Sequence, residues 1–240
     1  MDYLLRDAHH AGVAYGKFDQ LRLIGTLRIL PREDQETNEP DMGITGGGLQ
    51  AAESLLWGRY FMYTQLYFHP VRRIYDMHLT EFLTQALPGG KYEIDLGQHL
   101  ATTDNEILSE ISRASVDPTA RAHVTAARIA ERRHFRLLYE STPLDLQRNL
   151  KSPELIYTAA RKEFCDDLVR FNPYKSNADS EDFPVFQRDG SITSSVLLST
   201  TFAQPPRFAV AYVFVAPEIK EKAKAWLRSA KDKILSGDGR

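Results

Sequence analysis

The stretch GGGLQAAESLLWGRYFMYTQLYFHP, residues 46–70, decides most of what the sequence predicts about the fold. Three glycines precede a long run without proline, so we expect one helix over residues 48–68 that breaks at the proline closing the stretch. Leu55, Met62 and Leu66 recur on one side of this helix and predict a stripe that packs into a core. The segment therefore predicts a central helix in a mainly α-helical protein.

A second face of the same helix carries polar and aromatic side chains. Arg59, Tyr63 and Tyr67 are spaced four residues apart and lie along one line, and His69 follows just before the proline. Arginine binds phosphate with its forked guanidinium, and tyrosine stacks on a base or hydrogen-bonds to a sugar hydroxyl. Spacing alone leaves two interpretations open: a pocket wall for an anionic aromatic ligand, or half-buried core tyrosines beside a surface arginine.

The first residues, MDYLLRDAHHAG, have the pattern of a helix over residues 2–11. Tyr3 and Asp7 are four residues apart and share a face, where an aspartate beside a tyrosine can hold a sugar hydroxyl. The alternative is an ion-paired Asp7 on an ordinary helix whose C-terminal histidines interact with the helix dipole. Because Met1 falls inside a helical pattern with no capping residue before it, we expect a truncated reading frame or an alternative start codon.

The rest of the N-terminal half is expected to be helical apart from one β-hairpin. Residues 25–30 and 42–44 predict two paired strands, with an acidic loop over residues 31–40 between them. Further helices are predicted where helical spacing is bounded by proline, glycine or polar caps: residues 18–23, 71–87, 104–112, 119–133 and 152–170.

The composition changes toward the C-terminus. Segments rich in valine, phenylalanine and tyrosine predict three strands, over residues 183–187, 195–202 and 207–215. We expect them to form one small antiparallel sheet, followed by an amphipathic helix over residues 217–235. The predicted fold class is therefore mainly α with a small C-terminal α+β lobe.

Bulk properties narrow the class of protein. The chain has 240 residues, a formal net charge of −2 and a single cysteine. The near-neutral charge argues against nucleic acid as a partner, and one cysteine allows no intramolecular disulfide. No apolar run approaches the roughly 20 residues of a membrane span, and no signal peptide is visible. We therefore expect a cytoplasmic protein without a membrane partner.

The order of these clusters resembles that of HD-superfamily deoxynucleoside triphosphate triphosphohydrolases, which include the vertebrate sterile-alpha-motif and HD-domain enzyme and bacterial dGTPase-like enzymes. The likeness is carried by MDYLLRDAHHAG, the Phe18-Asp19 pair, the predicted hairpin, residues 53–69 and the Thr-Asp-Asn at 103–105. It implies a helical HD-type domain remnant over residues 1–140, with a β-hairpin insertion, and a C-terminal α+β lobe over residues 141–240.

By this resemblance, Tyr3 and Asp7 contact the deoxyribose and its 3′-hydroxyl, Arg59 contacts the triphosphate, and Tyr67 packs against the sugar. Two positions depart from the vertebrate pattern. Tyr63 replaces a histidine near the phosphates, and Phe68 replaces a glutamine that reads the sugar edge. The predicted substrate-binding residues are Tyr3, Asp7, Arg59, Tyr63, Tyr67 and His69.

The family's metal centre uses a His, a His-Asp pair and an Asp, all of which would precede Met1. The sequence contains no His-x-x-x-His or Cys-x-x-Cys spacing. We therefore predict no metal ligand and no certain catalytic residue in this chain, and a divalent metal such as Mg²⁺ or Mn²⁺ only in a full-length enzyme.

The leading hypothesis is a portion of a phosphohydrolase that converts a deoxynucleoside triphosphate to deoxynucleoside and triphosphate, inactive alone. The alternatives are a non-catalytic nucleotide-binding or regulatory subunit, and a helical interaction protein whose Arg/Tyr face packs on a partner. The resemblance also implies a deoxynucleoside triphosphate ligand and a homo-oligomer.

Overall fold

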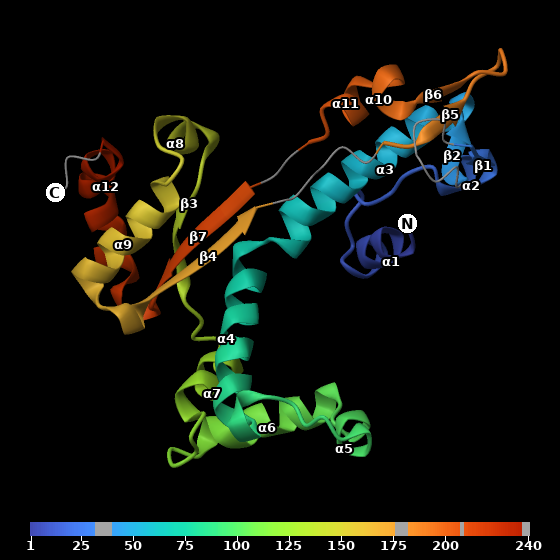
Figure 1. The fold of residues 1–240 in the computed structure, drawn as a ribbon. Helices are drawn as coiled ribbons and strands as arrows, with labels where there is room; N and C mark the ends of the chain where they lie inside the picture. The colour runs from blue at the N-terminus through green and yellow to red at the C-terminus, as the bar shows by residue number, and fades with distance from the viewer. Residues whose placement is uncertain (32–39, 176–181, 207–208, 237–240) are drawn as a thin grey trace. The chain divides into compact units, whose positions relative to one another are not determined.

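The computed structural model describes residues 1–31, 40–175, 182–206 and 209–236 (Figure 1). The chain forms two compact units, each assembled from segments that are distant in sequence. The first unit comprises Met1–Phe68 and Lys175–Ala209, and the second comprises His69–Tyr174 and Val210–Arg240. The mainly α-helical class with small sheets is confirmed. The domain boundary predicted after residue 140 remains a prediction.

The first unit combines helices with a four-stranded sheet. Its helices are α1 (Asp2–His10), α2 (Gln20–Thr26), η1 (Gly46–Gly48), α3 (Leu49–Met62), the π-helix η2 (Tyr63–Tyr67), α10 (Ser195–Leu198) and α11 (Thr200–Ala203). Its strands are β1 (Leu27–Leu30), β2 (Asp41–Thr45), β5 (Pro184–Phe186) and β6 (Ile192–Ser194), in the order β1-β2-β5-β6.

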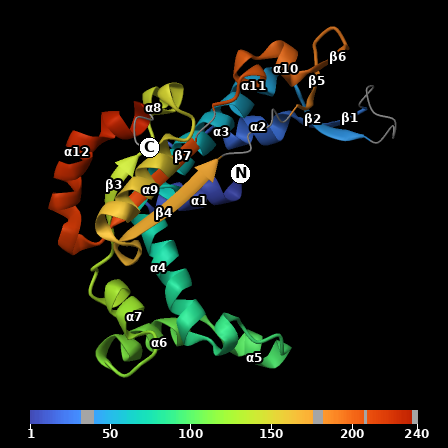
Figure 2. The same cartoon turned by 60° about the vertical axis from the view of Figure 1, so that its left-hand side comes forward.

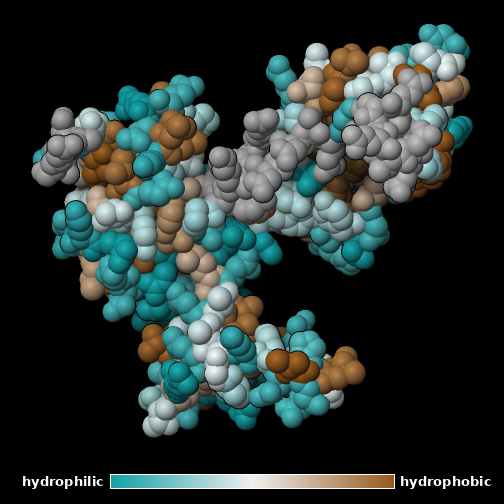
Figure 3. Space-filling model, in the orientation of Figure 1, coloured by the Kyte–Doolittle hydropathy of each residue, from teal (hydrophilic) through white to brown (hydrophobic). Residues whose placement is uncertain are grey.

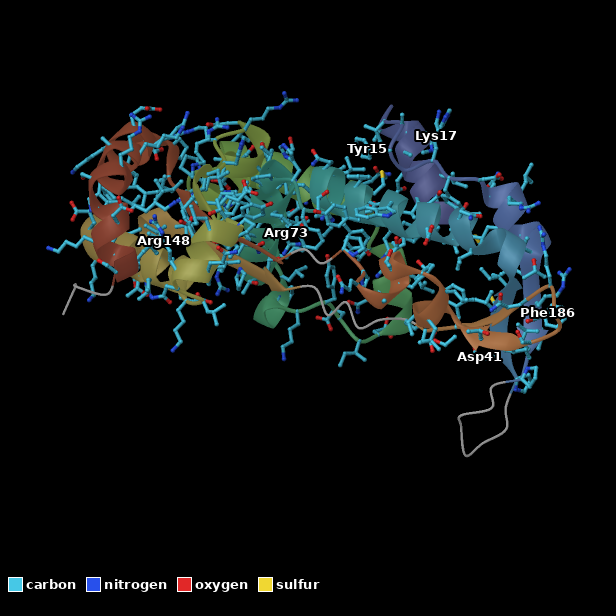
Figure 4. All side chains as sticks on the ribbon, turned by 90° about the horizontal axis from the view of Figure 1, so that it is seen from above. Tyr15, Lys17, Asp41, Arg73, Arg148 and Phe186 are labelled. Carbon is cyan, nitrogen blue, oxygen red and sulfur yellow. The ribbon has the colours of Figure 1, made fainter. Side chains whose placement is uncertain are left out.

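The predicted hairpin is confirmed, because β1 and β2 pair antiparallel with Leu27 opposite Ile44. The sheet then continues through a parallel pairing, in which Ile44 of β2 lies opposite Val185 of β5. Figure 4 labels Asp41, at the start of β2, and Phe186, at the end of β5. The C-terminal segment therefore completes the sheet that the N-terminal hairpin begins.

The strand predicted over residues 195–202 is wrong, because this segment folds as α10 and α11. Serine side chains supply the local hydrogen bonds that favour helix ends. The Ser199 hydroxyl accepts the N–H of Phe202 at 3.2 Å and so caps α11. The Ser195 hydroxyl donates to Asp182, 13 residues earlier, at 2.9 Å. Most of the predicted acidic loop (residues 32–39) and the first two residues of the strand predicted over 207–215 lie outside the described residues.

The second unit contains a three-stranded sheet in the order β3-β7-β4. Its strands are β3 (Arg136–Glu140), β4 (Val169–Lys175) and β7 (Ala209–Val215). Its helices are α4 (Pro70–Ala86), η3 (Pro88–Gly90), α5 (Leu96–Ala101), α6 (Asp104–Val116), α7 (His123–Ala130), α8 (Pro143–Arg148), α9 (Ser152–Phe164), η4 (Asp166–Leu168), η5 (Pro217–Ile219) and α12 (Lys220–Ser236).

Both faces of this sheet are covered, as the alternation along β7 requires. Val213 and Val215 pack with side chains of α9 and α12, which lie side by side in Figures 1 and 2. Tyr212 and Phe214 point to the other face and pack with Ile74 of α4. The predicted single antiparallel sheet is therefore wrong, because β5 and β7 belong to different sheets.

Helix ends account for most other corrections. The helix predicted over 119–133 is the shorter α7, and the helix predicted over 152–170 ends at Phe164. The chain turns at Cys165, whose φ of 81° ends the helix, and then enters β4. Strands β3 and β4 were not predicted, although they flank β7 in the sheet.

The segment around α5 adds nothing to the second unit's core. None of its residues is buried, and Ile94, Leu96 and Leu100 are between 70% and 99% exposed. Figure 3 shows hydrophobic residues at the surface of this part. Among the described residues, no helix combines the length and apolarity needed to cross a bilayer.

Charged side chains join α4 to β4 within the second unit. Arg170 Nε donates to Glu81, whose other carboxylate oxygen lies 3.4 Å from Nδ1 of the buried His78. The N–H of Phe135 donates to His78 Nε2 at 3.2 Å. Burial opposes ionisation of Glu81, but the hydrogen bonds from His78 and Arg170 outweigh it and lower the pKa of this carboxyl to about 2.

Glu81→Gln is expected to reduce the loss of stability on acidification between pH 4.5 and pH 2. The pKa of Glu81 lies below its ordinary value of 4.5, so its contribution is present above pH 4.5 and is lost as the pH falls through about 2. Urea unfolding at pH 7, 4 and 2.5 measures this slope, and Glu110→Gln, in an exposed ion pair with Arg113, is the control. An acid slope in Glu81→Gln equal to that of the wild type would contradict the prediction.

Candidate functional site

Packing between α1 and α3 brings two predicted residues together across 60 positions of sequence. Leu4 and Ala8 of α1 are buried against Met62 of α3, and Tyr67 packs against the same cluster, so the adjacent face of α1 that carries Asp7 lies beside Tyr67. There, the Tyr67 hydroxyl donates a hydrogen bond to Asp7 Oδ2 at 2.6 Å. This contact joins the two sequence clusters into one site.

A glycine permits this close approach. A Cβ at position 16 would lie 2.7 Å from Ala8 Cβ, 2.8 Å from Met62 Sδ and 3.0 Å from the Leu4 carbonyl oxygen. Any larger side chain at Gly16 would therefore separate α1 from α3.

Aromatic rings build the rest of the site. The rings of Tyr63 and Tyr67 meet edge to face, with centroids 5.1 Å apart, and Tyr3 lies 6.3 Å from Tyr67. The Arg59 guanidinium lies over the Tyr63 ring at 5.5 Å from its centroid. Behind Tyr63, the buried Phe68 stacks at 5.8 Å. Five of the six predicted site residues thus form one cluster in the first unit.

The helix that carries these rings is irregular where they lie. The N–H of Phe68 donates to the Tyr63 carbonyl at 2.8 Å, five residues back, so residues 63–67 form a π-helical turn. The regular helix predicted over residues 48–68 is therefore wrong in its last turn. Such π turns occur frequently at functional sites. The sequence signals a break at Pro70 but gives no sign of the extra residue in the turn.

The hydroxyls of Tyr3 and Tyr67 keep their protons. Burial, followed by the hydrogen bond to Asp7 and its charge, raises the pKa of Tyr67. Burial and the neighbouring Tyr63 raise the pKa of Tyr3, although Arg59 opposes the shift. Tyr67 is therefore a fixed donor to one oxygen of Asp7. Among the described residues no hydrogen bond reaches the other oxygen, Oδ1, which can accept one from a ligand hydroxyl.

The structure gives different positions or partners from those expected for Asp7 and His69. The ion pair considered for Asp7 is not formed among the described residues, because Arg6 pairs with Asp2 at 3.1 Å instead. His69 begins the second unit, where its Nδ1 accepts the N–H of Val71 at 3.3 Å and caps α4. Contact of each predicted residue with a ligand remains a prediction.

The implied divalent metal finds no ligand set in the part of the chain that the structure describes. No three side chains of His, Cys, Asp or Glu come together there in a group that could hold an ion. The site contains a single carboxylate, at Asp7, beside tyrosine hydroxyls and one guanidinium. They do not fit a metal centre, which needs several such groups.

Comparisons with known proteins place this chain among HD-associated sequences. Residues 18–152 match the family described as "HD associated region". The uncharacterized protein YwfO of Bacillus subtilis is 45% identical over 86 residues, which are 36% of this chain and 18% of that protein. The uncharacterized protein MJ1154 of Methanocaldococcus jannaschii is 34% identical over 115 residues, which are 48% of this chain and 24% of that protein.

Two solved structures have a similar fold. A hypothetical protein from Aquifex aeolicus matches with a TM-score of 0.77 and 30% identity, over 94% of this chain and 56% of that one. A phosphohydrolase from Bacteroides thetaiotaomicron matches with a TM-score of 0.62 and 18% identity, over 90% of this chain and 60% of that one. The chain thus spans less than two thirds of each of these proteins.

Proposed function

The chain belongs to the HD associated region family, and we propose that it forms the substrate-facing part of a metal-dependent phosphohydrolase acting on deoxynucleoside triphosphates. The observation that carries this proposal is the cluster in which Tyr67 holds Asp7 while Arg59 lies over Tyr63. The name of the Bacteroides protein of similar fold, a phosphohydrolase, supports the hydrolase class.

The cluster offers a different group to each part of such a substrate. Asp7 Oδ1 accepts a hydrogen bond from a sugar hydroxyl, and the Tyr67 hydroxyl keeps the carboxylate in place. The rings of Tyr3 and Tyr67 provide apolar surface for the sugar. Arg59 is exposed and presents its forked guanidinium to the phosphates. These residues bind and orient the substrate.

The proposed reaction releases deoxynucleoside and triphosphate. A divalent metal such as Mg²⁺ or Mn²⁺ supplies Lewis-acid chemistry in reactions of this class. Because the described residues offer no ligand set for it, the role assigned to this chain is binding and orientation of the nucleotide.

Ligand-induced stabilisation of the full chain tests the proposal. A ligand that binds only the folded state stabilises it by about 2.7 kcal/mol at a concentration of 100 times Kd, so dGTP is expected to raise the Tm. Tripolyphosphate at equal charge is the control for nonspecific anion effects. Chromatographic detection of deoxyguanosine, with Mn²⁺ present, shows whether the chain also hydrolyses dGTP. The absence of a Tm increase with all four deoxynucleoside triphosphates would refute the proposal.

Arg59→Ala is expected to weaken dGTP binding about 10- to 100-fold and to leave deoxyguanosine binding unchanged. The reason is that hydrogen bonds to a charged group contribute about 1.5–3 kcal/mol, and only the triphosphate engages the guanidinium. Calorimetric titration of both ligands measures the difference. Arg113→Ala, which removes an exposed arginine of α6, is the matched control. Equal losses for both ligands would exclude a phosphate contact by Arg59.

A further inference from the structure

Tyr63 has contacts with every other member of the cluster except Asp7. Its ring meets Tyr67 at 5.1 Å, Phe68 at 5.8 Å and the guanidinium of Arg59 at 5.5 Å. Its hydroxyl lies close enough to that of Tyr3 to raise the pKa of Tyr3. One half-buried side chain thus contacts both the group assigned to the phosphates and a group assigned to the sugar.

The ring of Tyr63 is fixed from two sides. Phe68 stacks nearly parallel to it, at an interplanar angle of 23°, and is itself buried. Tyr67 meets it almost perpendicularly, at 82°, and is anchored in turn by Asp7. Since Phe68 is part of the core, the ring of Tyr63 cannot tilt toward it without a clash, or away from it without opening a cavity.

We propose that Tyr63 is a positioning residue that orients Arg59 toward the phosphates with its ring and Tyr3 toward the sugar with its hydroxyl. This inference rests on the proposed function. The guanidinium of an exposed arginine has many rotamers, and attraction to a fixed aromatic face reduces their number before the ligand arrives. Tyr63 and Tyr67, whose rings meet edge to face, are the first and last residues of the π turn.

Two substitutions separate the ring from the hydroxyl. Tyr63→Phe keeps the aromatic face under Arg59 and removes the hydroxyl that interacts with Tyr3. Tyr63→Leu removes both. The quantity to measure is the Kd for deoxyguanosine divided by the Kd for dGTP, because this ratio isolates the contribution of the phosphates to binding.

Tyr63→Leu is expected to lower this ratio roughly two- to fivefold, the range for an exposed cation–π contact. Tyr63→Phe is expected to leave the ratio within about twofold of the wild type and to reduce the affinity for both ligands by the same factor. Tyr60→Leu, on the same helix but in a separate group with Trp57 and Phe61, is the matched control. A wild-type ratio in Tyr63→Leu would overturn the proposal.

A second readout needs no ligand. The Nε–H proton of Arg59, assigned through Arg59→Lys, is expected to show an upfield ring-current shift in NMR spectra of the wild type and Tyr63→Phe. The shift is expected to disappear in Tyr63→Leu, or in Tyr63→Met if the leucine variant does not fold. An unchanged Arg59 signal in these variants would overturn the positioning role.

Failure of the two proposals can be told apart. If the wild-type chain binds neither dGTP nor deoxyguanosine, the proposed function is refuted and the ligand role of Tyr63 with it. If the wild type binds dGTP, and the phosphate-dependent ratio and the Arg59 signal do not respond to loss of the ring, only the inference about Tyr63 is refuted.

Discussion

Gly43→Ala is expected to destabilise the first unit by about 3 kcal/mol, the upper part of the range for overpacking. A Cβ at this position would lie 2.1 Å from the carbonyl oxygen of Pro184 and 2.8 Å from Leu30 Cδ1. The carbonyl belongs to the backbone of β5, so it cannot move without disturbing the parallel pairing between β2 and β5. The loss of stability therefore comes from weaker pairing between β2 and β5.

Denaturant unfolding followed by tryptophan fluorescence measures this effect. The chain has two tryptophans, Trp57 in the first unit and Trp226 in the second, so a Trp226→Phe background reports on the first unit. Gly25→Ala is the matched control, because no atom lies within 4 Å of the added methyl group. Since Gly25 is helical, this control is expected to gain up to about 1 kcal/mol. Equal stabilities of the two variants would contradict the structure at Gly43.

Gly16→Ala is expected to destabilise the first unit by about 2 kcal/mol and to reduce dGTP binding at the same time. The added methyl group would collide with Ala8, and it would also come within 3.0 Å of the Leu4 carbonyl, so α1 must shift away from α3. That shift lengthens the hydrogen bond between Tyr67 and Asp7. Stability and ligand affinity are therefore coupled at this position.

Unfolding in the Trp226→Phe background and calorimetric titration with dGTP measure the two effects. Gly58→Ala is the control, because its methyl group would lie in the same interface but at an ordinary 3.5 Å from the Tyr15 carbonyl. Wild-type dGTP affinity in a folded but destabilised Gly16→Ala variant would show that the contact between α1 and η2 does not shape the binding site.

The residues of the candidate site could be predicted from the sequence, but the contacts between them across the two helices could not. Helical spacing puts Tyr3 with Asp7, and Arg59 with Tyr63 and Tyr67, because that geometry is local. The bond between Asp7 and Tyr67 depends on how two helices pack across 60 residues. The helix that carries the rings was predicted, but its π turn was not, because the turn depends on a hydrogen-bond shift that residue types do not encode.

The fold divides in the same way. The hairpin and the long helices follow from periodicity and from proline and glycine at their ends. Their ends were predicted within four residues, except that the helix beginning at Ser152 ends six residues earlier than predicted. Partners in the sheets were not predictable, because β5 pairs with a strand about 140 residues earlier and β3 joins β7 and β4. Residues 195–202 have the composition of a strand but form helices, with Ser199 capping α11 and Ser195 bonded to Asp182, and the bond to Asp182 could not be predicted from the sequence.

The π turn at residues 63–67 also constrains how this segment can change in evolution. Deleting one residue there would restore a regular helix, but it would turn everything before the deletion by about 100° relative to everything after it. An insertion would have the opposite effect. We therefore expect relatives to differ in the side chains of this turn more readily than in its length. In an alignment of relatives, gaps are expected to be absent from these five positions.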